Sequence, residues 1–193
     1  MNSFINGVAS APISFITNGL VQIIATSAKL IPDNPCFFYH EYLGNLQRLY
    51  PNIFHRQNPG WEFEAWKRAA VSAIIDGGIL EELFFRGLIQ DLLLKRLLGK
   101  AIMWLAPGQT SLMDSTLAKI FRISLTAGLF GGAHVISGEG SWGSKYQAFN
   151  AMLDGGILGI LKESRGGLMS CIGHHMMVNA TGMNSMLYYC VRV

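Results

Sequence analysis

The chain has 193 residues, of which 50% are hydrophobic and 14% are charged, and it contains 22 glycines. This length fits one domain, and the composition is apolar for a soluble protein without requiring a membrane. The formal net charge of +3 is small and the Lys and Arg residues are scattered, which argues against nucleic acid as a partner. Cys36, Cys171 and Cys190 are odd in number and far apart. They predict buried thiols, and neither a disulfide framework nor a cysteine zinc site.

The predicted elements are helices joined by loops. Residues 3–28 are uncharged but include Asn, Pro and Gln, a pattern that suits an interfacial, core or membrane helix. Residues 32–60 contain four prolines among polar and aromatic residues, which predicts a connector. Helical patterns with a strong apolar content follow at residues 69–94, 117–136, 148–161 and 167–191.

Three of these four later helices are long enough to cross a membrane, which takes about 20 apolar residues. We therefore expect an all-α, multi-pass membrane helical bundle that is integral to the inner or cell membrane and surrounded by the lipid bilayer. If the helices alternate in direction, the loops after the first and third lie on one side, which the positive-inside rule assigns to the cytoplasm. The basic residues on that side are Lys95, Arg96, Lys100, Lys119, Lys162 and Arg165, against Lys67, Arg68, Lys145 and Arg192 on the other.

The first polar motif, EELFFR, begins at Glu81 in the first of these later helices. A charge within an apolar stretch is costly and usually has a function. Glu82 and Arg86 are four residues apart, so we expect an ion pair between them. Glu81 points to a different face and leans over Gly77 and Gly78, which would leave room for a water or a substrate backbone beside the carboxylate.

Two further motifs lie in the later helices: FGGAH, ending at His134, and HMMVN, running from His175 to Asn179. His175 and Asn179 are four residues apart and share one face, whereas His174 points elsewhere. Taken singly, each motif also suits a structural role, because a core histidine often bonds a carbonyl and an asparagine can join two helices.

The order Glu-Glu-x-x-x-Arg, Phe-x-x-x-His, His-x-x-x-Asn on separate apolar helices resembles the CPBP family of intramembrane glutamic endopeptidases. This family includes the type II CAAX prenyl endopeptidases and bacteriocin-processing and self-immunity proteins. The sequence GGILGILKESRGGL at residues 155–168 also resembles the segment before the last family motif. The resemblance covers about residues 67–182 and implies a protease domain at residues 67–193. The helix and connector predicted from composition make up residues 1–66, which carry no recognised motif.

The resemblance also implies a role for each polar residue on the facing helices. In this interpretation Glu81 and His134 activate a water, His175 and Asn179 hold the oxyanion, and Glu82 and Arg86 support them. The protein would then be a hydrolase that cleaves a peptide or protein substrate at the membrane, near the C-terminus of a prenylated or membrane-associated chain, without a metal or cofactor. Residue chemistry agrees, because apolar surroundings raise the pKa of a carboxylic acid and make it a competent base near neutral pH.

Two other functions stay open at this point. A zinc hydrolase could use Glu81, His134 and His175 as three ligands with water in the fourth position, although the sequence has no His-Glu-x-x-His pair. A non-catalytic membrane scaffold or bacteriocin-immunity protein could also retain the helices and their polar contacts. Sensitivity to a chelator would identify the zinc enzyme, and peptide turnover would exclude the scaffold.

Overall fold

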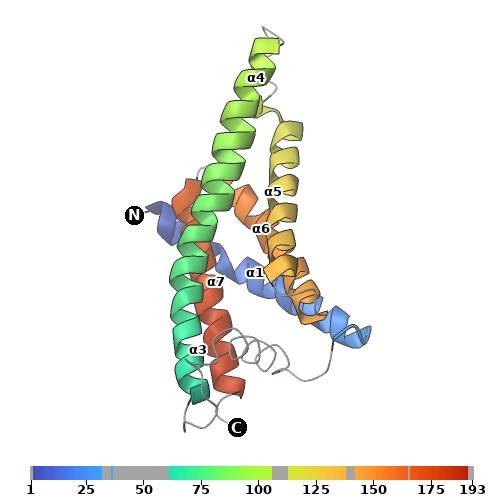
Figure 1. Ribbon diagram of the computed structural model, residues 1–193, viewed down its shortest axis with the longest axis vertical. Coiled ribbons are helices and arrows are strands. Elements are labelled where there is room, and N and C mark those ends of the chain that lie inside the picture. Colours follow the sequence, from blue (N-terminus) through green and yellow to red (C-terminus); the bar gives the residue numbers. More distant parts are fainter. Residues whose placement is uncertain are drawn as a thin grey trace.

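The computed structural model describes residues 2–31, 36, 61–105, 113–137, 142–164 and 166–190. In this part of the chain all regular elements are helices, which confirms the predicted all-α class. Four consecutive segments form a single long helix. They are α3 (Trp61–Ser72), η1 (Ala73–Glu81), η2 (Leu83–Leu97) and α4 (Leu98–Leu105). The others are α1 (Asn2–Ser27), α5 (Thr116–Ser137), α6 (Trp142–Glu163) and α7 (Gly167–Cys190). Figure 1 shows α7 beside the long helix, with α1 crossing behind them.

The predicted helix boundaries agree best where polar loops flank an apolar stretch. α5 and α7 match the expected ranges to within one residue at each end. The first of the four later helices is longer than expected, because it continues in both directions beyond residues 69–94. α6 also begins earlier, at Trp142. The connector predicted at residues 32–60 lies outside the described residues except for Cys36.

The long helix is π-wound through η1 and η2, where α-helical geometry was expected. In a π-helix each N–H bonds the carbonyl five residues back instead of four, and such segments are rare and frequently mark functional sites. Glu82 stands between η1 and η2 as a single α-helical residue, and its backbone N–H donates to the Ile79 carbonyl. The two adjacent glutamates of the first motif therefore lie at a change of helical geometry.

Glycines bring α5 and α6 close together. A Cβ added at Gly131 would come within 2.7 Å of the Ala148 carbonyl oxygen, and one at Gly159 within 2.9 Å of Ile123. α1 crosses α7 in a similar way, because a Cβ at Gly7 would collide with the backbone of Ser170. Small residues at such crossings let backbones approach closely, which is a common device in membrane helices.

Among the described helices, α1 has the length and hydropathy of a membrane span. Its outward side is apolar and exposed, at Ile5, Ile13, Ile16, Leu20, Ile23 and Ile24. The long helix also exposes apolar side chains around the first motif, at Leu80, Leu83, Phe84 and Leu88. Exposed apolar surface of this extent is typical of contact with a membrane or a protein partner. A multi-pass arrangement stays a prediction.

The prediction for the cysteines is wrong at two positions. Cys36 and Cys190 form a disulfide, with their Cα atoms 5.5 Å apart, whereas Cys171 is a buried free thiol as expected. The pairing joins residues that are 154 positions apart. Sequence spacing could not predict this pairing, because only the fold brings Cys36, which follows α1, close to Cys190 at the end of α7.

Candidate active site

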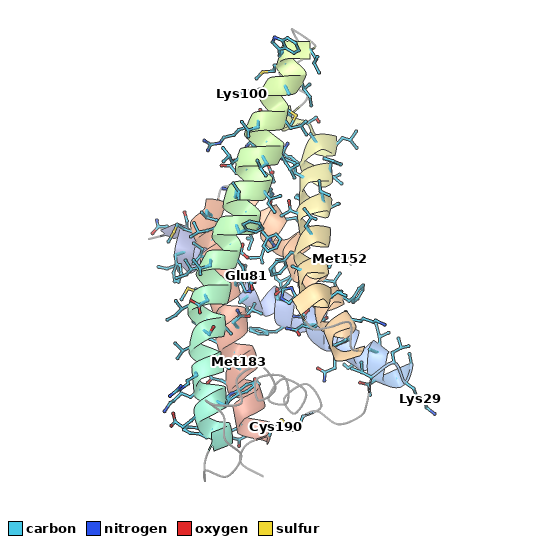
Figure 2. The ribbon with its side chains drawn as sticks, viewed as in Figure 1. Lys29, Glu81, Lys100, Met152, Met183 and Cys190 are labelled. Carbon is cyan, nitrogen blue, oxygen red and sulfur yellow. A yellow bond between two sulfur atoms is a disulfide. The ribbon has the colours of Figure 1, made fainter. Side chains whose placement is uncertain are left out.

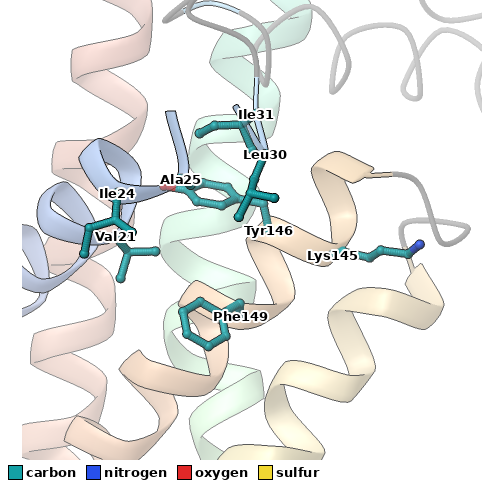
Figure 3. A pocket seen from close by; sticks show the side chains of 8 residues that line it. All are labelled: Val21, Ile24, Ala25, Leu30, Ile31, Lys145, Tyr146 and Phe149. Carbon is teal, nitrogen blue, oxygen red and sulfur yellow. The ribbon is translucent and has the colours of Figure 1, made fainter. Parts of the chain in front are cut away.

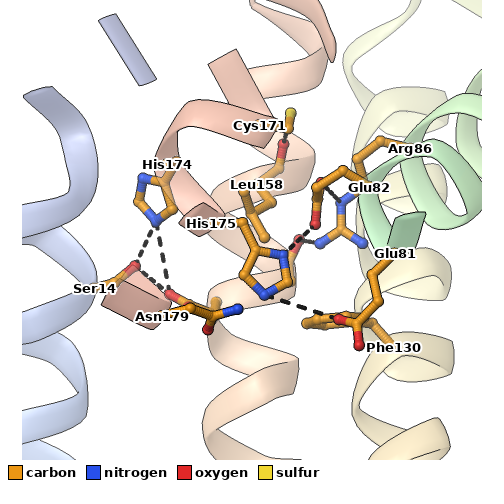
Figure 4. A network of polar contacts seen from close by, with 12 residues as sticks. Ser14, Glu81, Glu82, Arg86, Phe130, Leu158, Cys171, His174, His175 and Asn179 are labelled. Atoms are coloured by element: carbon orange, nitrogen blue, oxygen red, sulfur yellow. Dashed lines mark hydrogen bonds and ion pairs between the residues drawn. The ribbon is translucent and has the colours of Figure 1, made fainter. Parts of the chain in front are cut away.

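His175 of α7 lies between the two adjacent glutamates of the long helix (Figure 4). Its Nδ1 is 2.9 Å from Glu82 Oε1, and because the carboxylate accepts, the ring donates from Nδ1. This bond turns Nε2 toward Glu81, whose Oε2 is 3.8 Å away. That distance is too long for a direct hydrogen bond but suits a bridging water.

The two glutamates differ in their access to solvent. The Glu82 side chain is fully buried, and its Oε2 lies 3.4 Å from Nε of the buried Arg86, which confirms the predicted ion pair. Arg86 also donates from Nη2 to the Gly155 carbonyl of α6 at 3.1 Å. The Glu81 side chain is 38% exposed. Glu82 is thus committed to Arg86 and His175, whereas Glu81 remains accessible to water or a substrate.

Phe130 of α5 holds the two motif histidines in one aromatic group. Its ring meets His175 edge to face at a centroid distance of 5.7 Å and His134 at 4.9 Å. His134 donates from Nδ1 to the Phe130 carbonyl at 2.9 Å, which assigns the lone pair of the neutral ring to Nε2. The Arg86 guanidinium lies over the same ring, 4.9 Å from its centroid. His175 lies beside Glu81, and the role expected for His134 stays a prediction.

Asn179 and Gly77 form the edge of the site next to Glu81. Asn179 donates from Nδ2 to the Ala73 carbonyl at 2.6 Å. A Cβ on Gly77 would lie 3.1 Å from Asn179 Nδ2 and 3.9 Å from Glu81 Oε1, so the missing side chain lets the Asn179 amide approach the long helix beside the carboxylate. The expected room for a water or a substrate at Gly77 stays a prediction. Gly78 packs directly against Met176 of α7 and leaves no such room.

His174, which was expected to point away from the motif, faces a second buried polar group on α1 and α6. Its ring contacts Ser10, Ser14 and Asp154. No role was predicted for these three partners from the sequence. The signals available were the histidine doublet and the isolated acid in the apolar pattern of α6, but neither identifies the serines, which come from a different helix.

A third polar group ties the end of α6 to η2 and α5. Arg122 donates to both carboxylate oxygens of Glu163, from Nε and Nη2, each at 2.9 Å. Gln90 donates to the same carboxylate at 3.2 Å. We call Arg122, Glu163 and Gln90 the Arg122 cluster. It contains none of the motif residues.

A cavity next to α1 is separate from these polar groups. It measures about 390 Å³ and lies between the end of α1 and the start of α6 (Figure 3). Its lining is mostly apolar, from Val21, Ile24, Ala25, Leu30, Ile31, Lys145, Tyr146 and Phe149. Within the described ranges, no three His, Cys, Asp or Glu side chains are grouped in a way that could bind a metal ion. The zinc alternative, which would use Glu81, His134 and His175, gains no support from this part of the chain.

Comparison with known proteins supports the family that the three motifs indicated. The family model for type II CAAX prenyl endopeptidase Rce1-like proteins matches residues 64–181, more than half of the chain and all three motifs. No curated protein and no solved structure gives a significant match. Membership of a protease family implies that the substrate is a peptide or protein. The predicted CPBP resemblance is confirmed, and the chain belongs to the type II CAAX prenyl endopeptidase Rce1-like family of membrane-embedded proteases.

Proposed function

We propose that the protein is an intramembrane glutamic endopeptidase that hydrolyses a peptide bond with a water activated by Glu81. The observation that carries this proposal is the position of His175 between the buried carboxylate of Glu82 and the solvent-accessible carboxylate of Glu81. Glu82 fixes the ring through Nδ1, and Nε2 then faces the exposed Glu81 carboxylate across 3.8 Å. A water that donates one hydrogen to Glu81 Oε2 and the other to His175 Nε2 keeps its lone pairs available for a carbonyl carbon.

The remaining polar groups would act on the substrate carbonyl. Asn179 uses one hydrogen of its amide on the Ala73 carbonyl, and an amide nitrogen carries two. The second hydrogen can stabilise the oxyanion that forms when water attacks. Gly77 lies between Asn179 and Glu81, so an extended substrate could approach both groups over its backbone. We keep His134, held against Phe130, as the second histidine that positions water.

The setting supports a substrate that reaches the site from a membrane. Exposed leucines and phenylalanines surround the motif glutamates on the long helix, and α1 has the composition of a membrane span. We therefore propose a multi-pass bundle acting on a prenylated or membrane-associated peptide. The metal-dependent alternative is not favoured, because the described residues do not gather three ligands.

The proposal is tested with purified protein in lipid nanodiscs and a pair of peptides that share one sequence, one prenylated and one not. Mass spectrometry should detect cleavage by the wild type, and a zinc chelator should leave the rate unchanged. Glu81→Gln should lower turnover about 10²- to 10⁴-fold, the usual contribution of a general base.

Asp76→Asn is the matched control, because Asp76 is an exposed acid on the same π-wound segment that bonds only its neighbour Ser72 in the described contacts. It should retain activity. Full activity of folded Glu81→Gln would disprove the assignment of the base, and the absence of turnover of any peptide would favour the scaffold.

A further inference from the structure

A closed polar cluster lies on the side of α7 away from His175. It consists of Ser10 and Ser14 from α1, His174 from α7 and Asp154 from α6, and we call it the His174 cluster. Ser14 and His174 are 0% exposed and Asp154 is 8% exposed. Ser10 is half-buried, whereas the fully buried Ser14 and His174 side chains have no route to a substrate and need a role other than direct catalysis.

Hydrogen bonds join the members of this cluster into one network. Ser10 donates to the Gly7 carbonyl at 2.6 Å, and Ser14 donates to Asp154 Oδ1. Both hydroxyl oxygens also lie within hydrogen-bond distance of the His174 ring, Ser10 at 2.7 Å from Nδ1 and Ser14 at 2.8 Å from Nε2. Asp154 Oδ1 lies 3.9 Å from His174 Nε2, on the same side of the ring as Ser14. Both ring nitrogens of His174 therefore have a partner on α1.

The composition of serine, histidine and aspartate is that of a hydrolytic triad, but the geometry is different. In such a triad the acid bonds the nitrogen opposite the one that faces the serine. Here Ser14 and Asp154 both lie on the Nε2 side of His174, and Nδ1 bonds Ser10. Together with the burial, this excludes Ser14 as a nucleophile.

We propose that His174 is a positioning residue, whose cluster fixes the rotation of α7 about its axis so that His175 and Asn179 face Glu81. His174 and His175 are adjacent, so a rotation that moves one ring moves the other. Any such rotation would separate the buried His174 ring from its hydrogen-bond partners, which is costly because buried polar groups would be left unbonded. The inference rests on the proposed function for its meaning in catalysis.

The backbone next to His174 supports this role. A Cβ at Gly173 would collide with the Phe4 carbonyl of α1, and Ser170 donates from Oγ to the Ser3 carbonyl at 2.5 Å. α1 therefore touches α7 along the turn that leads to His174. Through this crossing, a helix outside the matched family segment reaches the helix that carries two motif residues.

The experiment compares Ser14→Ala with Thr17→Ala in the full-length protein in nanodiscs. Thr17 is the matched control, because its hydroxyl bonds only the Ile13 carbonyl of its own helix among the described contacts. The first measurement is the ¹⁵N spectrum of labelled histidines, in which His175 is assigned by the signal lost in His175→Gln. The second is kcat and KM for the cleaved peptide.

Ser14→Ala should shift both nitrogen signals of His175 and lower kcat about 10-fold, with KM changed less than twofold, since small misplacement of a catalytic group costs rate. Ser14→Thr keeps the hydroxyl and should restore both values, and Thr17→Ala should change neither. If Ser14→Ala does not fold, Asp154→Asn takes its place with the same measurements. An unchanged His175 spectrum in the folded variant would overturn the proposal. The spectrum decides this even if no peptide is cleaved, so failure of the proposed function is seen separately.

Discussion

Two buried glutamate–arginine pairs among the described residues differ in how completely they are bonded. In the Arg122 cluster, the guanidinium of Arg122 makes two parallel bonds to Glu163 at 2.9 Å and a third to the Met113 carbonyl at 2.7 Å. Gln90 adds a further bond to the same carboxylate. Such a bidentate pair is strong and geometrically specific, which suits a brace between helices.

The pair at the candidate site is looser and incomplete. Glu82 and Arg86 approach to 3.4 Å, and neither Glu82 Oε2 nor Arg86 Nε and Nη1 makes a hydrogen bond to a described residue. Buried polar groups are normally bonded, so these exceptions need an explanation. The fully bonded pair suits a role in stability, whereas the incompletely bonded pair includes the carboxylate that holds His175 beside the exposed Glu81.

Asn179 at the candidate site and Gln90 in the Arg122 cluster should differ most in the effect of their removal on turnover. Asn179→Ala should lower kcat about 10²- to 10³-fold with little change in KM, because it removes a donor to the developing oxyanion. Gln90→Ala should instead cost about 1–3 kcal/mol of stability by leaving Glu163 with fewer donors, with normal turnover per folded molecule. Turnover by mass spectrometry and thermal unfolding of both variants would separate these effects. If Asn179→Ala raised KM alone, the amide would position substrate instead.

The carboxylates give the second contrast. Glu82→Gln should lower turnover per folded molecule on the order of 10²-fold, because His175 loses the partner that orients it. Glu163→Gln should leave turnover per folded molecule unchanged while costing about 3–5 kcal/mol of stability, since it strands the buried Arg122. Equal losses of activity per folded molecule in the two variants would remove the distinction between site and brace.

The adjacent glycines give the smallest and most local contrast. Gly77→Ala places a methyl group 3.1 Å from Asn179 Nδ2, so we expect a several-fold lower kcat with stability changed by no more than about 1 kcal/mol. Gly78→Ala places one against the Met176 backbone, at 3.2 Å from Cα, and overpacking of this kind costs about 1–3 kcal/mol. Steady-state kinetics beside thermal melts would test this, and a stability loss at Gly77 with no kinetic effect would show that the space there is structural.

The sequence predicted what depends on local patterns. Apolar periodicity located α5 and α7, and the spacing of Glu82 and Arg86 predicted their ion pair. The order of the three motifs predicted the family, because it reflects residue types and spacing and does not require knowledge of the packing.

What could not be predicted depends on tertiary contacts. Nothing near Ser14 in the sequence indicates that it meets His174, which lies 160 positions away. The π-helical geometry of η1 and η2 changes which residues share a face of the helix, and no pattern in the sequence predicted this geometry. For the same reason Gly77 and Gly78 looked equivalent, whereas one borders the site and the other packs against α7.

The disulfide has a consequence for the sidedness of the protein in a membrane. A disulfide persists in oxidising compartments, and basic helix ends stay in the cytoplasm. Cys190 lies at one end of the molecule and Lys100 at the other, so the two rules agree (Figure 2). We infer that the Cys190 end faces away from the cytoplasm. In intact cells, an impermeant thiol reagent applied after reduction should label Cys190 and spare a cysteine placed at residue 100; the opposite pattern would reverse the orientation.

In the proposed multi-pass arrangement, in which α7 would cross the membrane, this sidedness would give the candidate site a depth. His175 lies eight residues after the start of α7 and 15 before its end. At about 1.5 Å per residue, these are roughly 12 Å and 22 Å along the helix. Hydrolysis would then occur in the cytoplasmic half of the membrane, within reach of a peptide tail anchored in the inner leaflet.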